Sequence, residues 1–327
     1  MGVKIAIDLG TVNSLVMIED KGIVANEPSF VAFSKKTKKV IAIGHEAKNM
    51  LGRSPEDVIV KKPLSQGVIA HYKLTQAFLF ELIKKALGKF VVFKPEIMVA
   101  VPAGLTSVEE RAVIEAVTQA GASKVLLIPE PIAASLGAMM PIEKSLGNMI
   151  INMGAGTVEI AVISLNGLVQ YESKRMAGDA INESIMSFVK KKFNIYIGEH
   201  MAESIKIQIG SALEISKPLK MEIRGSDITT GMPKMIELDT NDVVKPIKNV
   251  LEEIIKSIKF VLERTPPELA SDVIDQGIVL SGGTSLIRNI DILFSKAIEI
   301  PVFVAENPLE CTVRGVFKAL QNPELFD

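Results

Sequence analysis

The chain has 327 residues, 48% of them hydrophobic, which is enough apolar material for two domains and excludes a disordered protein. Its 37 lysines and arginines balance 38 aspartates and glutamates, so the charge favours no nucleic-acid partner, and we expect none. A single cysteine, Cys311, excludes an internal disulfide, and there is neither a visible leader nor an apolar run of ~20 residues, so we expect a cytoplasmic protein.

The first elements predicted along the chain are two strands joined by a glycine turn. Residues 5–18 read IAIDLGTVNSLVMI, and a third alternating segment opens at Gly22. A buried strand is predicted in KPEIMVAVPAGL, after which Thr106 and Glu109 form a capping box that starts a helix ending at Gly121. The strand KVLLIPEP and the helical segment IAASLGAMM follow.

The second half of the chain repeats this order. Residues 150–163, IINMGAGTVEIAVI, match the first hairpin with Asp8 opposite Asn152 and Gly10 opposite Gly154, and one extra residue is predicted in the second turn. The elements predicted after it are a segment from Gly167, the amphipathic helix DVVKPIKNVLEEIIKSIKFVLER, the strand QGIVLSGG and a helix from Ser285.

This internal repeat predicts the architecture. A meander followed by helix, strand, helix and strand, occurring twice, indicates a duplicated α/β fold with a sheet in each half. The two glycine turns then face each other across a cleft between the lobes, where α/β folds place ligands. Because glycine lets backbone N–H groups approach an anion closely, the turns predict a site that holds a polyphosphate from both sides.

The chain resembles the actin, sugar kinase and heat-shock chaperone ATPase superfamily, and within it the bacterial actin family MreB. The resemblance rests on motifs in order along nearly the whole chain, among them IDLGTVNSLV, NEPSFVAF, GHEAKNMLGRSPEDVIVKKPLSQGVIA, VPAGLTSVEERAV, EPIAASLGA, IGEHMAESIKIQIGSA, IRGSDITTGMPK, TPPELASDVI, GIVLSGGTSLIRNID and ENPLECTVRG. It implies an actin-like fold whose two lobes each hold a ribonuclease-H-like mixed β-sheet flanked by helices, with a nucleotide cleft between them. The implied subdomains are IA (1–32, 66–145, 312–327), IB (33–65), IIA (146–181, 245–311) and IIB (182–244).

The resemblance also implies a site for ATP and Mg²⁺. Asp8 would position the metal, and Glu130 would orient the attacking water. The residues implied to bind nucleotide are Gly10, Thr11, Val12 and Asn13 at the β-phosphate, Gly154, Ala155, Gly156 and Thr157 at the γ-phosphate, and Glu203, Lys206, Gly282, Gly283 and Thr284 at the nucleoside.

Simpler interpretations stay open for several of these residues. Asp8 is also compatible with an ordinary turn acid, and Glu130 with a carboxylate that interacts with the helix dipole. Glu203 and Lys206, three positions apart on one helix, are also compatible with a surface ion pair.

The chain departs from the family pattern in its loops. Asn152 replaces the acid of the second loop, Ala155 its middle glycine and Val158 its second threonine, while Thr284 replaces the third glycine of the nucleoside loop. Asparagine lacks the charge that helps to hold hydrated Mg²⁺, and valine has no hydroxyl to fix a water. We therefore expect a weak Mg-dependent ATPase, and the nucleotide preference is open because Thr284 could reshape the pocket.

The function implied by the resemblance is an ATP-binding, filament-forming cytoskeletal protein for cell shape or motility. Its partner would be itself, as a homopolymer with paired protofilaments, and Phe90 to Phe93 between lysines would contact the inner face of the membrane unless they lead into a buried strand. The alternatives are a nucleotide-binding scaffold without hydrolysis and a chaperone-type ATPase.

Overall fold

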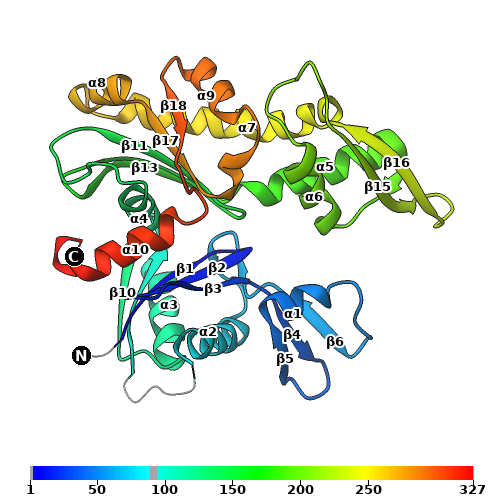
Figure 1. Ribbon diagram of the computed structural model, residues 1–327, viewed down its shortest axis with the longest axis horizontal. Helices are drawn as coiled ribbons and strands as arrows, with labels where there is room; N and C mark the ends of the chain where they lie inside the picture. The colour runs from blue at the N-terminus through cyan, green and yellow to red at the C-terminus, as the bar shows by residue number, and fades with distance from the viewer. Residues whose placement is uncertain (1–2, 89–93, 327) are drawn as a thin grey trace.

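The computed structural model describes residues 3–88 and 94–326, which form two lobes that are each built on a five-stranded sheet (Figure 1). The first lobe has the strand order β10 (Lys124–Pro129), β9 (Glu96–Val101), β1 (Lys4–Leu9), β2 (Asn13–Ile18) and β3 (Gly22–Pro28). The second lobe has the order β13 (Gly167–Lys174), β12 (Val158–Ser164), β11 (Asn148–Met153), β17 (Ile278–Ser281) and β18 (Val302–Val304). In both sheets the meander is antiparallel and the remaining pairs are parallel, which confirms the predicted duplication.

Each face of the first sheet belongs to a different core. Successive side chains of a strand point to opposite faces, so Ile5 and Ile7 of β1 pack with helices α2 (Tyr72–Leu87) and α3 (Ser107–Gln119), whereas Ala6 faces the second lobe. Helix α3 begins with the predicted capping box, in which Thr106 and Glu109 bond each other's backbone N–H groups.

The second sheet buries its outer face under four helices, α5 (Gly178–Phe193), α7 (Thr240–Arg264), α8 (Pro267–Gln276) and α9 (Ile290–Ile298). Helix α7 is the long amphipathic helix that the sequence predicts, and it starts with a capping box between Asp239 and Asp242. In Figure 1, α7, α8 and α9 lie on the side of the sheet away from the first lobe, and α5 extends from the sheet toward the right.

Two helices cross between the sheets, α4 (Glu130–Gly137) and α10 (Cys311–Gln321) (Figure 1). They share a core with both sheets that contains Ala6 and Ile150. The small residues predicted for this segment allow a very close crossing, because a Cβ on Gly315 would lie 1.6 Å from the carbonyl oxygen of Ala133. The two helices therefore touch through nearly bare backbone, and the lobes are joined through the apolar core that these helices share with both sheets.

Each lobe carries a smaller part on the same side of the molecule, at the right in Figure 1. On the first lobe it consists of β5 (Val40–Ile43), β4 (Val31–Ser34) and β6 (Val58–Lys61) with α1 (Gly44–Asn49). On the second lobe it consists of β14 (Ile195–Tyr196), β15 (Lys220–Asp227) and β16 (Pro233–Asp239) with α6 (Glu199–Ile209). A separate hairpin is made of β7 (Leu64–Ser65) and β8 (Val68–Ile69), and the short helix η2 (Pro323–Leu325) follows α10.

The predicted start of the helix after β17 is wrong. Instead of an α-helix from Ser285, the chain forms the short 3-10 helix η1 (Gly283–Leu286), and α9 begins only at Ile290. The reason is Asn289, whose φ of 61° is left-handed and cannot lie inside an α-helix. The subdomain boundaries stay predictions.

Two observations concern the membrane. Within residues 3–88 and 94–326, no helix is long and apolar enough to span a bilayer. Phe90 to Phe93, predicted to touch a membrane surface, lie outside the described residues.

Candidate functional site

The first glycine turn, Gly10 to Asn13, connects β1 to β2 at the edge of the first sheet that faces the second lobe. Ser29, just beyond β3, braces it from behind, since its hydroxyl donates to the carbonyl oxygen of Gly10 at 2.6 Å and its backbone N–H donates to Val12 at 2.8 Å. Ser29 is fully buried. Sequence reasoning did not identify this brace.

The second turn, Gly154 to Thr157, connects β11 to β12 and has the same length as the first. The strand registers show this, because Leu9 pairs with Ser14 and Met153 with Val158. The prediction of an extra residue in the second turn is therefore wrong. The β12–β13 pair has a register shift between Val162 and Ile163, and the β2–β3 pair has the corresponding shift between Val16 and Met17, so this β-bulge is part of the repeat.

The two turns meet between the lobes. A Cβ on Gly156 would lie 2.6 Å from Oγ1 of Thr11, so the second turn approaches the first more closely than a side chain would permit. The tip of the β7–β8 hairpin completes the contact, since the N–H of Gly67 donates to Oγ1 of Thr11 at 3.1 Å and Gln66 adjoins Gly156. The sequence did not indicate that this hairpin joins the site.

Three carboxyl groups gather next to the turns: Asp8 at the end of β1, Glu130 at the start of α4 and Glu159 on β12. Burial raises the pKa of Asp8 to about 7, and burial likewise raises that of Glu159 to about 7. The pKa of Glu130 lies well above its usual range because of burial and the nearby charges of Glu159 and Asp8. Glu159 was not singled out from the sequence, although its isolated charge in an apolar strand was a signal.

Two of these groups connect the lobes. Nδ2 of Asn152 in the second lobe donates to Oε2 of Glu130 at 3.2 Å. Glu159 accepts from the backbone N–H of Ala103 in the first lobe at 3.0 Å and from Oγ of Ser173 in its own lobe at 2.6 Å. Glu130 is therefore more than a carboxylate at a helix start, since it contacts Asn152, the residue that replaces the family's acid in the second loop.

The third loop lies against the second turn. Oγ1 of Thr284 donates to the carbonyl oxygen of Gly154 at 2.6 Å. Nζ of Lys206 donates to the carbonyl oxygen of Gly178 at 3.1 Å. A Cβ on Gly178 would lie 2.8 Å from Oγ1 of Thr284 and 3.1 Å from Nζ of Lys206. The structure thus brings residues from four separate segments together at the second turn.

Ion pairs connect the two smaller parts at the mouth of the cleft. Nζ of Lys48 lies 3.5 Å from Oε2 of Glu203, Nζ of Lys62 lies 3.7 Å from Oδ2 of Asp179, and Lys62 also pairs with Glu199. Burial alone would lower the pKa of Lys62, but the charges of Asp179 and Glu199 outweigh it and raise the pKa. The partner of Glu203 is therefore Lys48 of the other lobe.

Lys206 and Asp179 are both half-buried next to this network. Burial lowers the pKa of Lys206, opposed by the charges of Glu203 and Asp179, and burial raises the pKa of Asp179, opposed by Lys62. The space that Lys62, Glu199 and Glu203 line with their neighbours is only about 20 Å³. Little free space is therefore left among these side chains.

Position 158 does not face the cleft. Val158 is fully buried in the core of the second lobe with Ile160 and Val162, because alternate residues of β12 point that way. The prediction that Val158 removes a hydroxyl from the attacking water is therefore wrong. The hydroxyl next to the first lobe belongs to Thr157, whose side chain adjoins Gly67.

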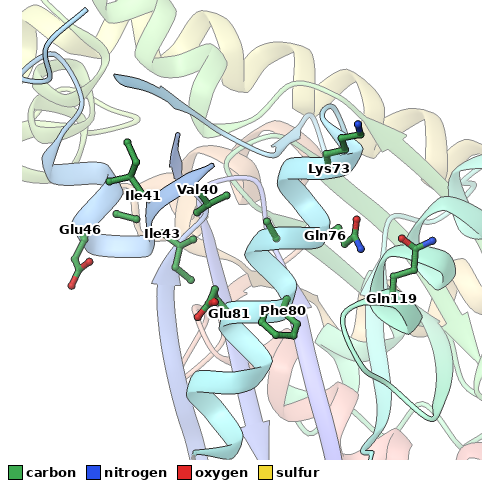
Figure 2. A pocket seen from close by; sticks show the side chains of 11 residues that line it. Val40, Ile41, Ile43, Glu46, Lys73, Gln76, Phe80, Glu81 and Gln119 are labelled. Atoms are coloured by element: carbon green, nitrogen blue, oxygen red, sulfur yellow. The ribbon is translucent and has the colours of Figure 1, made fainter. Parts of the chain in front are cut away.

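Within residues 3–88 and 94–326, no three His, Cys, Asp or Glu side chains are arranged to hold a metal ion by themselves. A separate surface groove of 730 Å³ lies between β5 and α2, and its lining includes Val40 and Ile43 of β5 and Phe80 of α2 (Figure 2). It belongs to the first lobe only and lies away from both turns. The site that combines the predicted residues is the cleft between the lobes.

Duplicated sheets, two helices crossing between them and paired glycine turns in the cleft define an actin-like protein. The sequence model described as "MreB/Mbl protein" matches residues 2–327, and the chain belongs to this family. The chain is 41% identical over 318 residues to the cell shape-determining protein Mbl of Bacillus cereus, covering 97% of this chain and 96% of that protein. It is 42% identical over 322 residues to the cell shape-determining protein MreB of Escherichia coli, covering 97% and 93%.

A solved structure agrees with this assignment. The crystal structure of MreB 5 of Spiroplasma citri bound to AMPPNP superposes with a TM-score of 0.94 at 33% identity, covering 99% of this chain and 97% of that one. The predicted family, the actin-like fold and the cytoskeletal, cell-shape class of function are thereby confirmed.

Proposed function

We propose that this chain binds ATP with Mg²⁺ in the cleft, polymerises with itself and hydrolyses ATP slowly. The observation that carries the proposal is the meeting of Gly156 with Thr11, because it puts two glycine turns from separate lobes at one point. A relative at 33% identity was solved with AMPPNP, whose triphosphate resembles that of ATP, which supports the same ligand here.

The binding roles follow the order of segments in the cleft. The turn Gly10 to Asn13 would hold the β-phosphate and the turn Gly154 to Thr157 the γ-phosphate through backbone N–H groups. The loop Gly282 to Thr284 would line the adenosine pocket, and Glu203 and Lys206 would approach the nucleoside. Since Glu203 pairs with Lys48 across the cleft, nucleoside contact would compete with that ion pair.

The residues present fit a magnesium ion. Asp8 and Glu130 are buried near each other and their pKa values are raised, which is the state expected of carboxyl groups that face one another without a cation. Mg²⁺ takes most of its ligands from water and phosphate, so a single positioning acid such as Asp8 suffices. When bound, the ion would neutralise phosphate charge; Asn152, being uncharged, would attract it less than the family's acid.

The contact between Asn152 and Glu130 slows hydrolysis. Glu130 must accept a hydrogen bond from the attacking water, but Nδ2 of Asn152 donates to Glu130 at 3.2 Å and so occupies one of its oxygens. One poorly made positioning contact costs ~2 to 4 kcal/mol of barrier, or roughly 30- to 1000-fold in rate.

Electron microscopy of the pure protein with ATP, ADP or no nucleotide, over liposomes, tests assembly and lipid contact together. We expect a cytoplasmic protein that forms filaments only with ATP. The filaments should consist of paired protofilaments and should lie on the liposome surface. A Gly156→Ala variant should lose nucleotide binding and filaments, because the added Cβ would meet Thr11 and the backbone of Gln66 at 3.0 Å. Gly167→Ala is the matched control, since its Cβ would make only an ordinary contact at 3.6 Å.

Phosphate release separates the slow hydrolase from a second candidate, a nucleotide-binding scaffold without hydrolysis. The hydrogen bond from Asn152 to Glu130, which occupies an oxygen of that carboxyl group, favours that candidate. Filaments that form with ATP and release no phosphate would establish the scaffold. Absence of nucleotide binding in wild type would overturn both.

A further inference from the structure

The two glycine turns are held by the same device. The carbonyl oxygen of Gly10 accepts from the hydroxyl of Ser29 at 2.6 Å, and the carbonyl oxygen of Gly154 accepts from the hydroxyl of Thr284 at 2.6 Å. In each case the hydroxyl comes from a segment outside the turn, and in each case its residue is almost completely buried. The internal repeat therefore includes one hydrogen bond from a side-chain hydroxyl to each turn, although Ser29 and Thr284 do not lie in a shared sequence motif.

The brace at the second turn is part of a closed arrangement. The carbonyl oxygen of Gly154 also accepts from the N–H of Gly178 at 3.3 Å, and the N–H of Asp179 donates to the carbonyl oxygen of Ala155 at 2.9 Å. The N–H of Gly154 donates to the carbonyl oxygen of Thr157 at 2.9 Å and closes the turn. Thr284 supplies the short contact to this turn from a side chain.

Holding a carbonyl in this way fixes an N–H group as well. The peptide bond is planar and trans, so its C=O and N–H point in opposite directions. The carbonyl of Gly154 and the N–H of Ala155 belong to one peptide group. When Thr284 holds that carbonyl on one side, the N–H of Ala155 is directed to the opposite side, which is how oriented N–H groups form an anion-binding turn.

We propose that Thr284 is a positioning residue for the terminal phosphate of the nucleotide, acting through the peptide group between Gly154 and Ala155. The proposal rests on the proposed nucleotide function. The hydroxyl of Thr284 fixes the turn that faces the γ-phosphate, which ATP has and ADP lacks. The residue thereby sets the preference of the site for ATP over ADP, and the family's glycine at this position has no hydroxyl to do so.

Side-chain variants separate the hydroxyl from the shape of the residue. Thr284→Val keeps the shape and removes the hydroxyl, whereas Thr284→Ser keeps the hydroxyl. We expect Thr284→Val to weaken ATP binding roughly 3- to 10-fold more than ADP binding, as the loss of one hydrogen bond predicts, with Thr284→Ser close to wild type. Equal loss for ATP and ADP, or equal values for all three proteins, would overturn the proposal.

Ser285 provides the matched control. It is the next residue in η1, it is buried, and its hydroxyl donates to Gly282 within its own loop at 2.6 Å. Ser285→Ala removes a hydroxyl from the same short helix without touching the second turn, so its ratio of ATP to ADP affinity should equal that of wild type. A changed ratio would mean that any disturbance of η1 alters the preference.

Amide hydrogen exchange in the nucleotide-free protein distinguishes failure of this proposal from failure of the proposed function. Thr284→Val should exchange faster than wild type in residues 154–157, and Thr284→Ser should not. If wild type binds no nucleotide, the proposed function fails while this measurement still tests the brace. If exchange in the turn is the same in all variants, the brace is wrong whatever the chain binds.

Discussion

Thr157 and Val158 are neighbours in the chain, yet their side chains face different parts of the molecule. Thr157 adjoins Gly67 of the first lobe, and Val158 lies in the core of the second lobe. Removing the hydroxyl of Thr157 as Thr157→Val should slow phosphate release at least about tenfold, because positioning of the attacking water by such groups is worth that much. A malachite-green phosphate assay with ATP measures it.

The neighbouring variant serves as the comparison. Val158→Thr restores the family's residue, but its hydroxyl enters an apolar core, so phosphate release should not rise and the free energy of unfolding should fall by about 1 to 3 kcal/mol. A faster phosphate release in Val158→Thr would contradict the structure's placement of this side chain.

Glu159 makes the stability of the fold depend on pH. Its pKa is about 7 in the folded protein against an ordinary value of 4.5, so between these values the folded state keeps a proton that the unfolded state has released. The free energy of unfolding therefore falls as pH rises from 4.5 to 7, by up to about 3 kcal/mol from this group. Below 4.5 the stabilisation is complete, and above 7 it is lost.

Glu159→Gln should flatten this decline, since an amide does not titrate. The amide can still accept from Ala103 and donate to Ser173, so both contacts of Glu159 are retained. Urea denaturation at several pH values measures the effect. A variant whose stability falls with pH as steeply as that of wild type would assign the decline to Asp8 and Glu130.

The sequence indicated those site residues that lie within repeated local patterns, and missed those that arrive through tertiary contacts. Gly10 and Gly154 follow strands of matching sequence, so their turns could be predicted. Ser29, Glu159 and Gln66 reach the cleft only because the sheets, the hairpin and the two lobes fold together. The side of the sheet to which the Val158 side chain points depends on the strand register, and a comparison of sequence motifs does not give that register.

Among helices and strands, the crossing of α4 with α10 depends on the absence of side chains. A Cβ on Gly315 would lie 1.6 Å from the carbonyl oxygen of Ala133, and backbone cannot move aside as a flexible side chain can. Gly315→Ala should therefore push the helices apart and destabilise the protein by about 3 kcal/mol or more. Thermal unfolding by circular dichroism measures this, and a midpoint unchanged from wild type would contradict the crossing.

Element types could be predicted from the sequence better than their ends. The capping box at Thr106 and the amphipathic period of α7 are local signals, and both helices form where predicted. The segment after Gly283 has no comparable start signal, and the left-handed Asn289 divides it into η1 and α9. Nδ2 of Asn289 donates to Oγ of Ser211 at 3.0 Å, a contact between distant segments that the local sequence does not indicate.

For the molecule as a whole, the lobes are tied together at both ends of the cleft. At its base they share the crossing of α4 with α10, and at its mouth Lys48 and Lys62 pair with acids of the other lobe. The contact at the base is an apolar core, whereas the contacts at the mouth are ion pairs. Opening for nucleotide should therefore break the ion pairs and leave the base intact.

Release of bound ADP should then depend on salt and on these lysines. Exposed or half-exposed ion pairs are worth about 0 to 1 kcal/mol each, so Lys62→Ala, which breaks two pairs, should release ADP up to roughly thirtyfold faster. Raising the ionic strength should accelerate release from wild type and have less effect on the variant. Lys192→Ala is the control, because its pair with Asp242 lies within the second lobe. Stopped-flow displacement of a fluorescent ADP measures the rates, and release from wild type that does not respond to salt would mean that the mouth of the cleft opens without breaking these pairs.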